Sequence, residues 1–90
     1  MFGLSDSELC QIRSLLQSSG ITKAFIFGSR AKGNYKVGSD VDIAIDGDET
    51  KASYLLNEES QLPYYFDIVN INKIKNKNLL DHIKRVGALL

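Results

Sequence analysis

The segment from residue 28 to residue 45 constrains the fold more strongly than any other part of the chain. It begins with the sequence GSRAKG (28–33) and ends with SDVDIAI (39–45). Residues 40–45 alternate strictly, with Val41, Ile43 and Ile45 on one side, as in a strand with one buried face. The apolar run at residues 21–27 lacks alternation and predicts a central strand that is covered on both faces. We therefore expect a central strand, then a turn and a short loop, and then a second strand with one buried face.

The rest of the chain predicts helices that alternate with strands. Ser5 and Glu8 have capping-box spacing before a helix at residues 6–18. Other expected elements are a helical turn at 30–32 capped by Ser29, a helical segment at about 50–59, a strand at 64–70, and an amphipathic helix from about residue 76 to Leu90. Ninety residues suffice for one core. We predict a single α/β domain over residues 1–90, with helices packed in two or three layers on a mixed sheet that has a three-strand core.

Charge and composition exclude several classes of protein. Eleven basic and eleven acidic residues balance, so no overall field attracts nucleic acid or an anionic membrane, and any nucleic-acid contact has to be local. No apolar run has membrane-spanning length, and the first ten residues lack the features of a signal peptide. The only cysteine, Cys10, excludes an internal disulfide and a cysteine-rich zinc site. We therefore expect a cytoplasmic protein without a membrane partner.

Three aspartates are the candidate metal ligands. Asp40 and Asp42 lie about 6.6 Å apart along one side of a strand, where they can converge on one Mg²⁺ or on a pair about 3.5–4 Å apart. Asp67 is the one charged residue in the apolar run of the next strand, and it can supply a third carboxylate if the two strands are neighbours. Without a cation such carboxylates repel one another. The alternative for Asp40 and Asp42 alone is an exposed edge strand with two solvated side chains.

The turn at Gly28 and Ser29 is the candidate phosphate site. Glycine lets the backbone approach an anion, and the N–H groups that open a helical turn point towards it. Arg30 and Lys32 either add positive charge for a phosphate or belong to the solvated surface. The turn matches neither a Walker A loop nor a Rossmann fingerprint, so its significance depends on the ten residues that separate it from Asp40.

Taken together, these residues resemble the minimal nucleotidyltransferase (MNT) domains of the DNA polymerase β superfamily. The resemblance rests on Gly28 and Ser29, on the sequence DVDI at 40–43, and on the later Asp67, and it extends from Ile21 to about Leu89. It implies transfer of a nucleoside monophosphate from an NTP to a hydroxyl, with two Mg²⁺ ions. Asp40 and Asp42 would hold the metals, Asp67 would complete the second metal site and help to deprotonate the hydroxyl, and Gly28 and Ser29 would hold the phosphates.

The MNT branch also suggests a partner. Its members are often encoded beside a HEPN-family protein, and such a pair can act as toxin and antitoxin, with the transferase adding AMP from ATP to tyrosines of the partner. The short chain leaves no room for an acceptor site of its own, so we expect another protein to supply the acceptor. Two alternatives remain: a non-catalytic module that neutralises its partner by complex formation, and a domain that binds a nucleotide as a regulatory ligand. The sequence identifies neither the nucleotide nor the acceptor.

Overall fold

A four-stranded mixed sheet forms the centre of the molecule, in the strand order β3-β2-β1-β4. The structure is a computed structural model that describes residues 1–90. Strand β1 (Ala24–Phe27) pairs antiparallel with both β2 (Val41–Ile45) and β4 (Ala88–Leu89). Strand β2 also pairs in parallel with β3 (Phe66–Asn70). The predicted α/β fold with a mixed sheet is confirmed, and a fourth strand is added at one edge.

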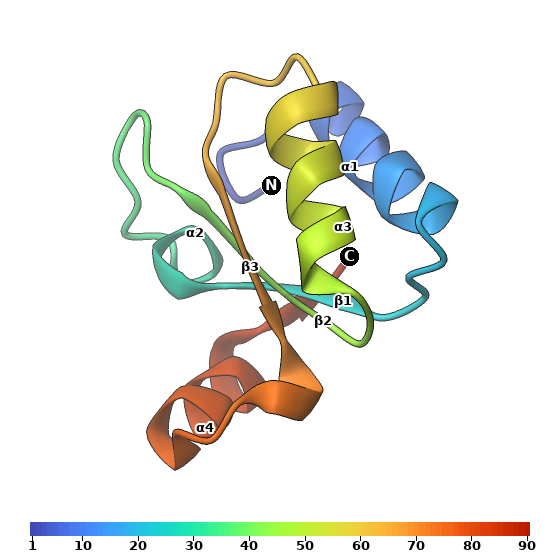
Figure 1. Cartoon of the computed structure of the whole chain (residues 1–90). Coiled ribbons are helices and arrows are strands. Elements are labelled where there is room, and N and C mark those ends of the chain that lie inside the picture. Colours follow the sequence, from blue (N-terminus) through green and yellow to red (C-terminus); the bar gives the residue numbers. More distant parts are fainter.

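Helices cover both faces of this sheet. Helix α1 (Asp6–Ser18) and helix α3 (Glu49–Tyr54), which continues into the π-helical turn η1 (Leu55–Glu59), lie on one face. Helix α4 (Lys77–Val86) lies on the other face, so the domain has three layers (Figure 1). Two short elements complete the chain, α2 (Gly28–Lys32) and the 3₁₀ turn η2 (Ile71–Lys73). None of these helices combines the length and the apolar character that a membrane span requires.

The alternation in β2 divides the apolar core between the two faces. Val41, Ile43 and Ile45 are fully buried in the larger cluster with residues of α1 and α3. Ala44 faces the opposite side and packs with Phe27 and Ile83 in a smaller cluster beneath α4. Asp42 shares the face of Ala44, because residues i and i+2 of a strand point the same way. The residue pattern of β2 therefore places an acidic side chain on the α4 face of the sheet.

The first helix forms as predicted. The Ser5 hydroxyl accepts a hydrogen bond from the Glu8 backbone N–H at 3.1 Å, and the Ser5 N–H donates to Glu8 Oε1 at 2.9 Å. This reciprocal capping box satisfies two N–H groups that a helix start leaves without intrahelical partners. The helical segment expected at about 50–59 is also present, as α3 followed by η1.

Several boundaries differ from the prediction. Strand β1 begins at Ala24 instead of Ile21, because the Ile21 N–H still donates to Leu16 O at the end of α1. The last helix ends at Val86, and the chain then turns back so that β4 pairs with β1. Ser29 is not a helix cap: α2 begins at Gly28, after Phe27, and has no side-chain cap. Strands β2 and β3 are each shorter at their start than expected, at Val41 and Phe66.

The side chain of Asn57 holds the outer edge of β3. Its Nδ2 donates to Phe66 O at 2.9 Å, and its Oδ1 accepts from the Phe66 N–H at 2.8 Å. Phe66 is fully buried, so these backbone groups have little access to water. Asn57 thus replaces a neighbouring strand at the start of β3, the edge strand that carries Asp67.

We expect Asn57→Ala to lower the free energy of unfolding by about 1–3 kcal/mol, because it leaves a buried N–H and C=O without partners. Urea unfolding measures this change. Asn78→Ala, at an exposed position of α4, is the matched control and should change stability by less than about 0.5 kcal/mol. Equal losses in the two variants would contradict the assigned role of Asn57.

Candidate active site

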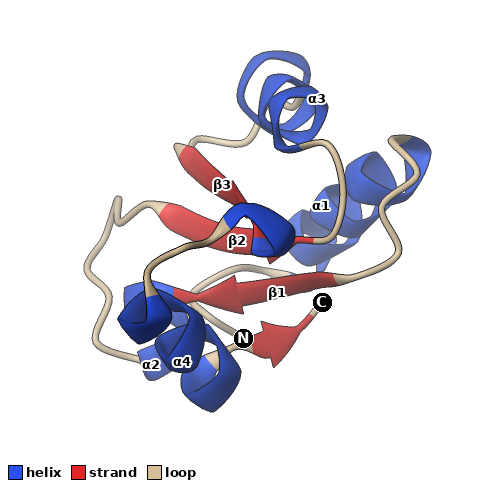
Figure 2. Ribbon diagram, turned by 60° about the horizontal axis from the view of Figure 1, so that its bottom comes forward, coloured by secondary structure: helices blue, strands red, loops and turns tan.

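The candidate site lies where three strand ends meet. Strand β1 ends there, and β2 and β3 begin there, close to α2 and α4 (Figure 2). Asp42 is the partner of Phe27 across the antiparallel pair and of Asp67 across the parallel pair. Strand neighbours in such a register carry side chains on the same face of the sheet. The pairing therefore places the carboxylates of Asp42 and Asp67 side by side and brings Gly28, the residue after Phe27, next to them.

Gly28 is in direct contact with Asp42. Its φ of +74° lies in the left-handed region that side chains disfavour, and a Cβ built on it would collide with Asp42 Oδ2 and lie 3.2 Å from Asp42 Cγ. Two independent reasons thus require glycine at this position. The Asp42 carboxylate occupies the space that a side chain at position 28 would fill.

The carboxylates of the site repel one another. Burial raises the pKa of the Asp42 carboxyl, and the negative charges of Asp67 and Asp40 raise it further, while a positive charge on His82 acts in the opposite direction. Asp40 lies just before β2 and is exposed, as is Asp67. Asp42 is therefore half-buried and experiences the negative charges of two exposed carboxylates.

Carboxylate oxygens that repel one another are a suitable donor set for a hard divalent cation, because the cation removes the repulsion. The side chains as they stand, however, contain no group of three or more His, Cys, Asp or Glu residues that could hold a metal ion. The sequence predicted three convergent carboxylates. The structure brings Asp42 and Asp67 together on neighbouring strands and leaves Asp40 at the start of the same strand as Asp42.

The two basic residues of α2 differ in their surroundings. Lys32 is exposed at the end of α2. Arg30 is only 3 % exposed, and its guanidinium donates to the backbone carbonyls of Ser39 and Phe2. These contacts account for Arg30 without a phosphate. Arg30 is therefore not among the residues that we propose to hold a phosphate, although its place in the sequence suggested that role.

His82 is a residue near the site that its sequence context alone did not mark as functional. It lies on α4, where its ring meets the ring of Phe27 edge to face at a centroid distance of 6.2 Å, and its charge affects the pKa of Asp42. The signal in the sequence is its spacing: His82 stands three residues after Leu79, on the side of α4 that also carries Ile83. The sequence does not show that His82 lies beside Phe27, because that contact follows from the packing of α4 on the sheet.

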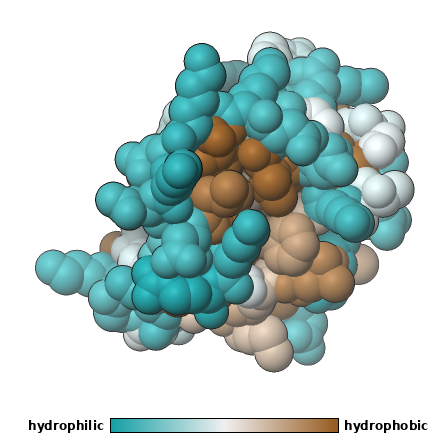
Figure 3. Space-filling view, turned by 90° about the horizontal axis from the view of Figure 1, so that it is seen from below, coloured by the Kyte–Doolittle hydropathy of each residue, from teal (hydrophilic) through white to brown (hydrophobic).

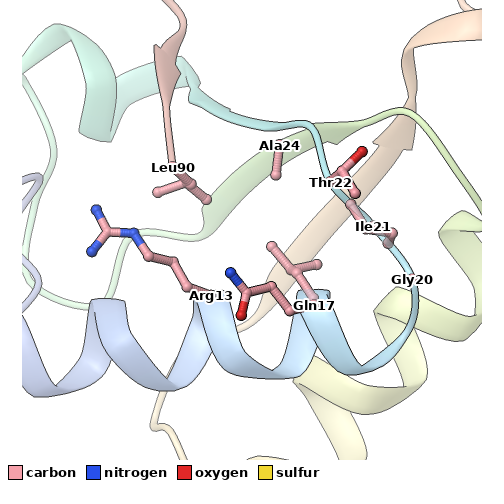
Figure 4. Close-up of a pocket in the computed structure, with 8 residues that line it drawn as sticks. Arg13, Gln17, Gly20, Ile21, Thr22, Ala24 and Leu90 are labelled. Carbon is pink, nitrogen blue, oxygen red and sulfur yellow. The ribbon is translucent and has the colours of Figure 1, made fainter.

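The three best-defined cavities of the structure are not lined by Gly28 or by the three aspartates. One of them, of about 390 Å³, lies at α1, where Arg13 and Gln17 stand across from Ala24 and Leu90 (Figure 4). No carboxylate lines it. Viewed from below, on the α4 side, the molecule shows hydrophobic residues at the centre of a mainly hydrophilic face (Figure 3). On this side of the sheet, which Asp42 also faces, the half-buried apolar residues are Val69, Ile71, Ile74 and Leu79, and we refer to them as the apolar surface of the α4 side.

Gly28→Ala should destabilise the protein by about 1–3 kcal/mol more than Gly33→Ala, because the new Cβ meets the Asp42 carboxylate. Gly33 is the matched control: its φ is +88° and a Cβ there meets nothing within 4 Å, so its substitution carries the backbone strain alone. The two free energies of unfolding, measured in urea, decide the point. Equal losses of unfolding free energy in the two variants would show that position 28 needs glycine only for its left-handed backbone conformation.

The raised pKa of Asp42 predicts how stability depends on pH. The folded protein holds this proton more tightly than the unfolded chain, so the stability that Asp42 contributes is present at low pH. It is lost as the pH rises from below 3.8, the usual value for aspartate, into the neutral range. Without divalent ions at pH 7, Asp42→Asn should therefore be more stable than the original protein by about 0.5–1 kcal/mol, a gain limited by solvent screening.

Urea unfolding across this pH range measures the difference between the two proteins, which should grow with pH. Glu58→Gln, the same change at an exposed carboxylate of η1, is the control and should show no such trend. A difference between Asp42→Asn and the original protein that stays constant with pH would contradict the repulsion at the site.

Comparison with known proteins identifies the family and the fold of this chain. Residues 10–90 match the family model described as "Polymerase beta, Nucleotidyltransferase". A crystal structure of a toxin–antitoxin with AMP-PNP is similar in fold, with a TM-score of 0.72, 21% sequence identity, and coverage of 89% of this chain and 69% of that chain. A crystal structure of a proposed nucleotidyltransferase from Sulfolobus solfataricus has a TM-score of 0.43 and 19% identity, and covers 97% of this chain and 88% of that one. None of the curated protein sequences is significantly similar.

The family match covers nearly the whole chain, including the turn at Gly28 and all three aspartates. The structural match shares the small α/β architecture with its mixed sheet. The chain belongs to the polymerase β nucleotidyltransferase family.

Proposed function

We propose that this protein transfers AMP from ATP to a hydroxyl group of a partner protein, with a divalent cation in the site. The observation that supports this most directly is the strand register: Asp42 lies beside Asp67 on one strand and opposite Phe27 on the other, next to Gly28. This register brings an open glycine turn and a pair of carboxylates to the same point. A nucleotidyltransferase needs a place for the phosphates beside its metal ligands.

In this proposal Asp40 and Asp42 hold Mg²⁺, and Asp67 completes the site for a second ion. The mutual repulsion that raises the pKa of Asp42 supports this assignment, since a cation would relieve it. When bound, Mg²⁺ neutralises charge on the triphosphate and stabilises the leaving pyrophosphate. Binding should require side-chain rearrangement, because the carboxylates as they stand form no group of three.

The turn at Gly28 and Ser29 would hold the triphosphate. It opens α2 without a side-chain cap, so the first backbone N–H groups of α2 are free to donate to an anion. The absent Cβ of Gly28 lets the Asp42 carboxylate lie directly against the turn, so that a cation held by Asp42 would be close to the phosphates. Lys32, exposed at the end of α2, can add positive charge nearby.

The reaction is an in-line displacement at the α-phosphorus. The hydroxyl oxygen of the acceptor forms a bond to this phosphorus, while the bond between the phosphorus and the bridging oxygen of pyrophosphate breaks. In the proposal Asp67 accepts the proton of the attacking hydroxyl. Its exposed position on the edge strand β3 is compatible with this role, because an acceptor can reach it from outside. Catalysis then depends mainly on orientation and charge stabilisation.

The acceptor in this proposal is a HEPN-family toxin, which the transfer of AMP inactivates. Support comes from the resemblance to the MNT branch and from the fold shared with a toxin–antitoxin whose crystal structure contains AMP-PNP. The apolar surface on the α4 side offers contact area on the same face of the sheet as Asp42. Exposed apolar surfaces of this kind are common at protein interfaces.

Transfer of label from α-³²P-ATP in the presence of Mg²⁺ tests the proposal, with the protein encoded beside this one as acceptor. We expect label on the acceptor from α-³²P-ATP and none from γ-³²P-ATP, since γ-label would indicate phosphoryl transfer. Asp42→Asn should reduce the rate at least about 100-fold, because it removes a ligand of the cation that stabilises the transition state.

Asp81→Asn, an exposed carboxylate on α4 that pairs with Arg85, is the control and should retain the rate. Absence of label with ATP, GTP, CTP and UTP, in a complex that forms with its partner, would contradict the transferase function. Neutralisation of the partner that survives Asp42→Asn would instead support a non-catalytic binding module.

A further inference from the structure

The contacts of Arg30 point to a function for a residue that faces away from the site. Arg30 is the only charged or polar residue that is buried, at 3 % exposure. Neither ion pair of the structure includes it. Burial of a cation without an opposite charge is costly unless its donors are satisfied in another way. The groups that contact Arg30 therefore show how its burial is compensated and which segments it holds together.

Backbone carbonyl oxygens accept the hydrogen bonds of the Arg30 guanidinium in place of a carboxylate. Nε and Nη2 both donate to Ser39 O, at 3.1 and 2.9 Å, and Nη1 donates to Phe2 O at 2.9 Å. Two aromatic rings lie against the guanidinium, with Cζ 5.3 Å from the ring centre of Tyr35 and 4.9 Å from that of Tyr64. Contacts of this type stabilise a desolvated cation.

Phe2 lies near the N-terminus, but Ser39 and Tyr64 belong to the segments that lead into the strands of the candidate site. Arg30 itself is in α2, two residues after Gly28. Ser39 immediately precedes Asp40, and Tyr64 lies three residues before Asp67. A single residue of α2 therefore contacts both segments that lead into the strands of Asp42 and Asp67.

Few contacts other than those of Arg30 fix the loop from residue 33 to residue 38. Every residue in this range is exposed, and Val37 is completely so. Figure 1 shows the loop extending outward between α2 and β2. Besides the contacts of Arg30, the Asn34 N–H donates to Ser29 O at 3.2 Å, and Lys36 and Ser39 bond to each other, from the Lys36 N–H to the Ser39 hydroxyl at 2.8 Å and from the Ser39 N–H to Lys36 O at 3.0 Å. Asp40 is therefore held from two sides: Arg30 bonds to Ser39 O before it, and the Val41 N–H after it donates to Tyr65 O at 2.9 Å.

We propose that Arg30 is a positioning residue, which holds the Ser39–Asp40 segment against α2 so that Asp40 can join Asp42 and Asp67 in binding the cation. The link to the cation rests on the proposed function. The contacts of Arg30 with Ser39, Phe2 and the two rings, which we call the clamp, are a property of the fold. Lysine cannot replace arginine here, because its single ammonium cannot donate to Ser39 O and Phe2 O in the same fork geometry or stack on two rings.

Two measurements on Arg30→Lys test the inference, with Arg13→Lys, at an exposed position of α1, as the matched control. In hydrogen–deuterium exchange, the hydrogen-bonded amides within residues 34–40, those of Asn34, Lys36 and Ser39, should exchange at least about 10-fold faster in Arg30→Lys, while the amides of β1 and β2 keep their protection. Titration with Mn²⁺ followed by electron paramagnetic resonance should show binding about 10-fold weaker, comparable with the loss of other groups that orient metal ligands. Arg13→Lys should match the original protein in both.

Unchanged exchange at residues 34–40 in Arg30→Lys would overturn the clamp, and unchanged Mn²⁺ affinity despite faster exchange would overturn its link to Asp40. If Arg30→Lys does not fold, Tyr35→Leu, which removes one of the two rings beside Arg30, decides by the same criteria with smaller expected changes of about 3-fold. Failure of the original protein to bind Mn²⁺ would count against the proposed function, and the exchange data would still decide the clamp.

Discussion

The position of Asp42 is the constraint on which the rest of the site depends. It lies opposite Phe27 on β1 and beside Asp67 on β3, so both neighbouring strands determine what surrounds its carboxylate. Burial and two further carboxylates make its negative charge unfavourable, and a Cβ on Gly28 would collide with it. A domain selected only for stability would replace this aspartate with an apolar residue, as at Ala44 on the same face. An unfavourable charge of this kind is typical of functional sites.

Much of the architecture could be predicted because single strands and helices leave local signals. The alternation of residues 40–45 is enough to predict that Val41, Ile43 and Ile45 lie on the opposite face of the strand from Asp42. The capping box at Ser5 and Glu8 locates the start of α1. Strand β4 could not be predicted in this way: it has only two residues, too few for alternation, and its pairing with β1 is set by where Gly87 ends α4. The start of β1 is equally hidden, because Ile21 is apolar enough for a strand while its N–H still bonds to the end of α1.

The site was partly predictable for the same reason. The spacing of Asp40 and Asp42 and the lone charge of Asp67 within an apolar run identified the carboxylates, and the register then placed two of them side by side. Arg30 shows the limit of the sequence, since a basic residue after a glycine turn suggests a phosphate ligand. Only the packing reveals that its donors are directed to backbone carbonyls. In this account the buried Arg30 holds the segment that carries one of the aspartates of the site. The local sequence pattern could not distinguish Arg30 from the exposed Lys32.

A crystal structure with Mn²⁺ and a non-hydrolysable ATP analogue tests the account most directly, because anomalous scattering locates the cation independently of the protein atoms. We expect Mn²⁺ bound by Asp42 together with Asp40 and Asp67, and the triphosphate at the turn of Gly28 and Ser29. A nucleotide bound at another surface, such as the cavity beside α1, or bound at the turn with no cation at Asp42, would contradict the assignment of these residues to nucleotidyl transfer.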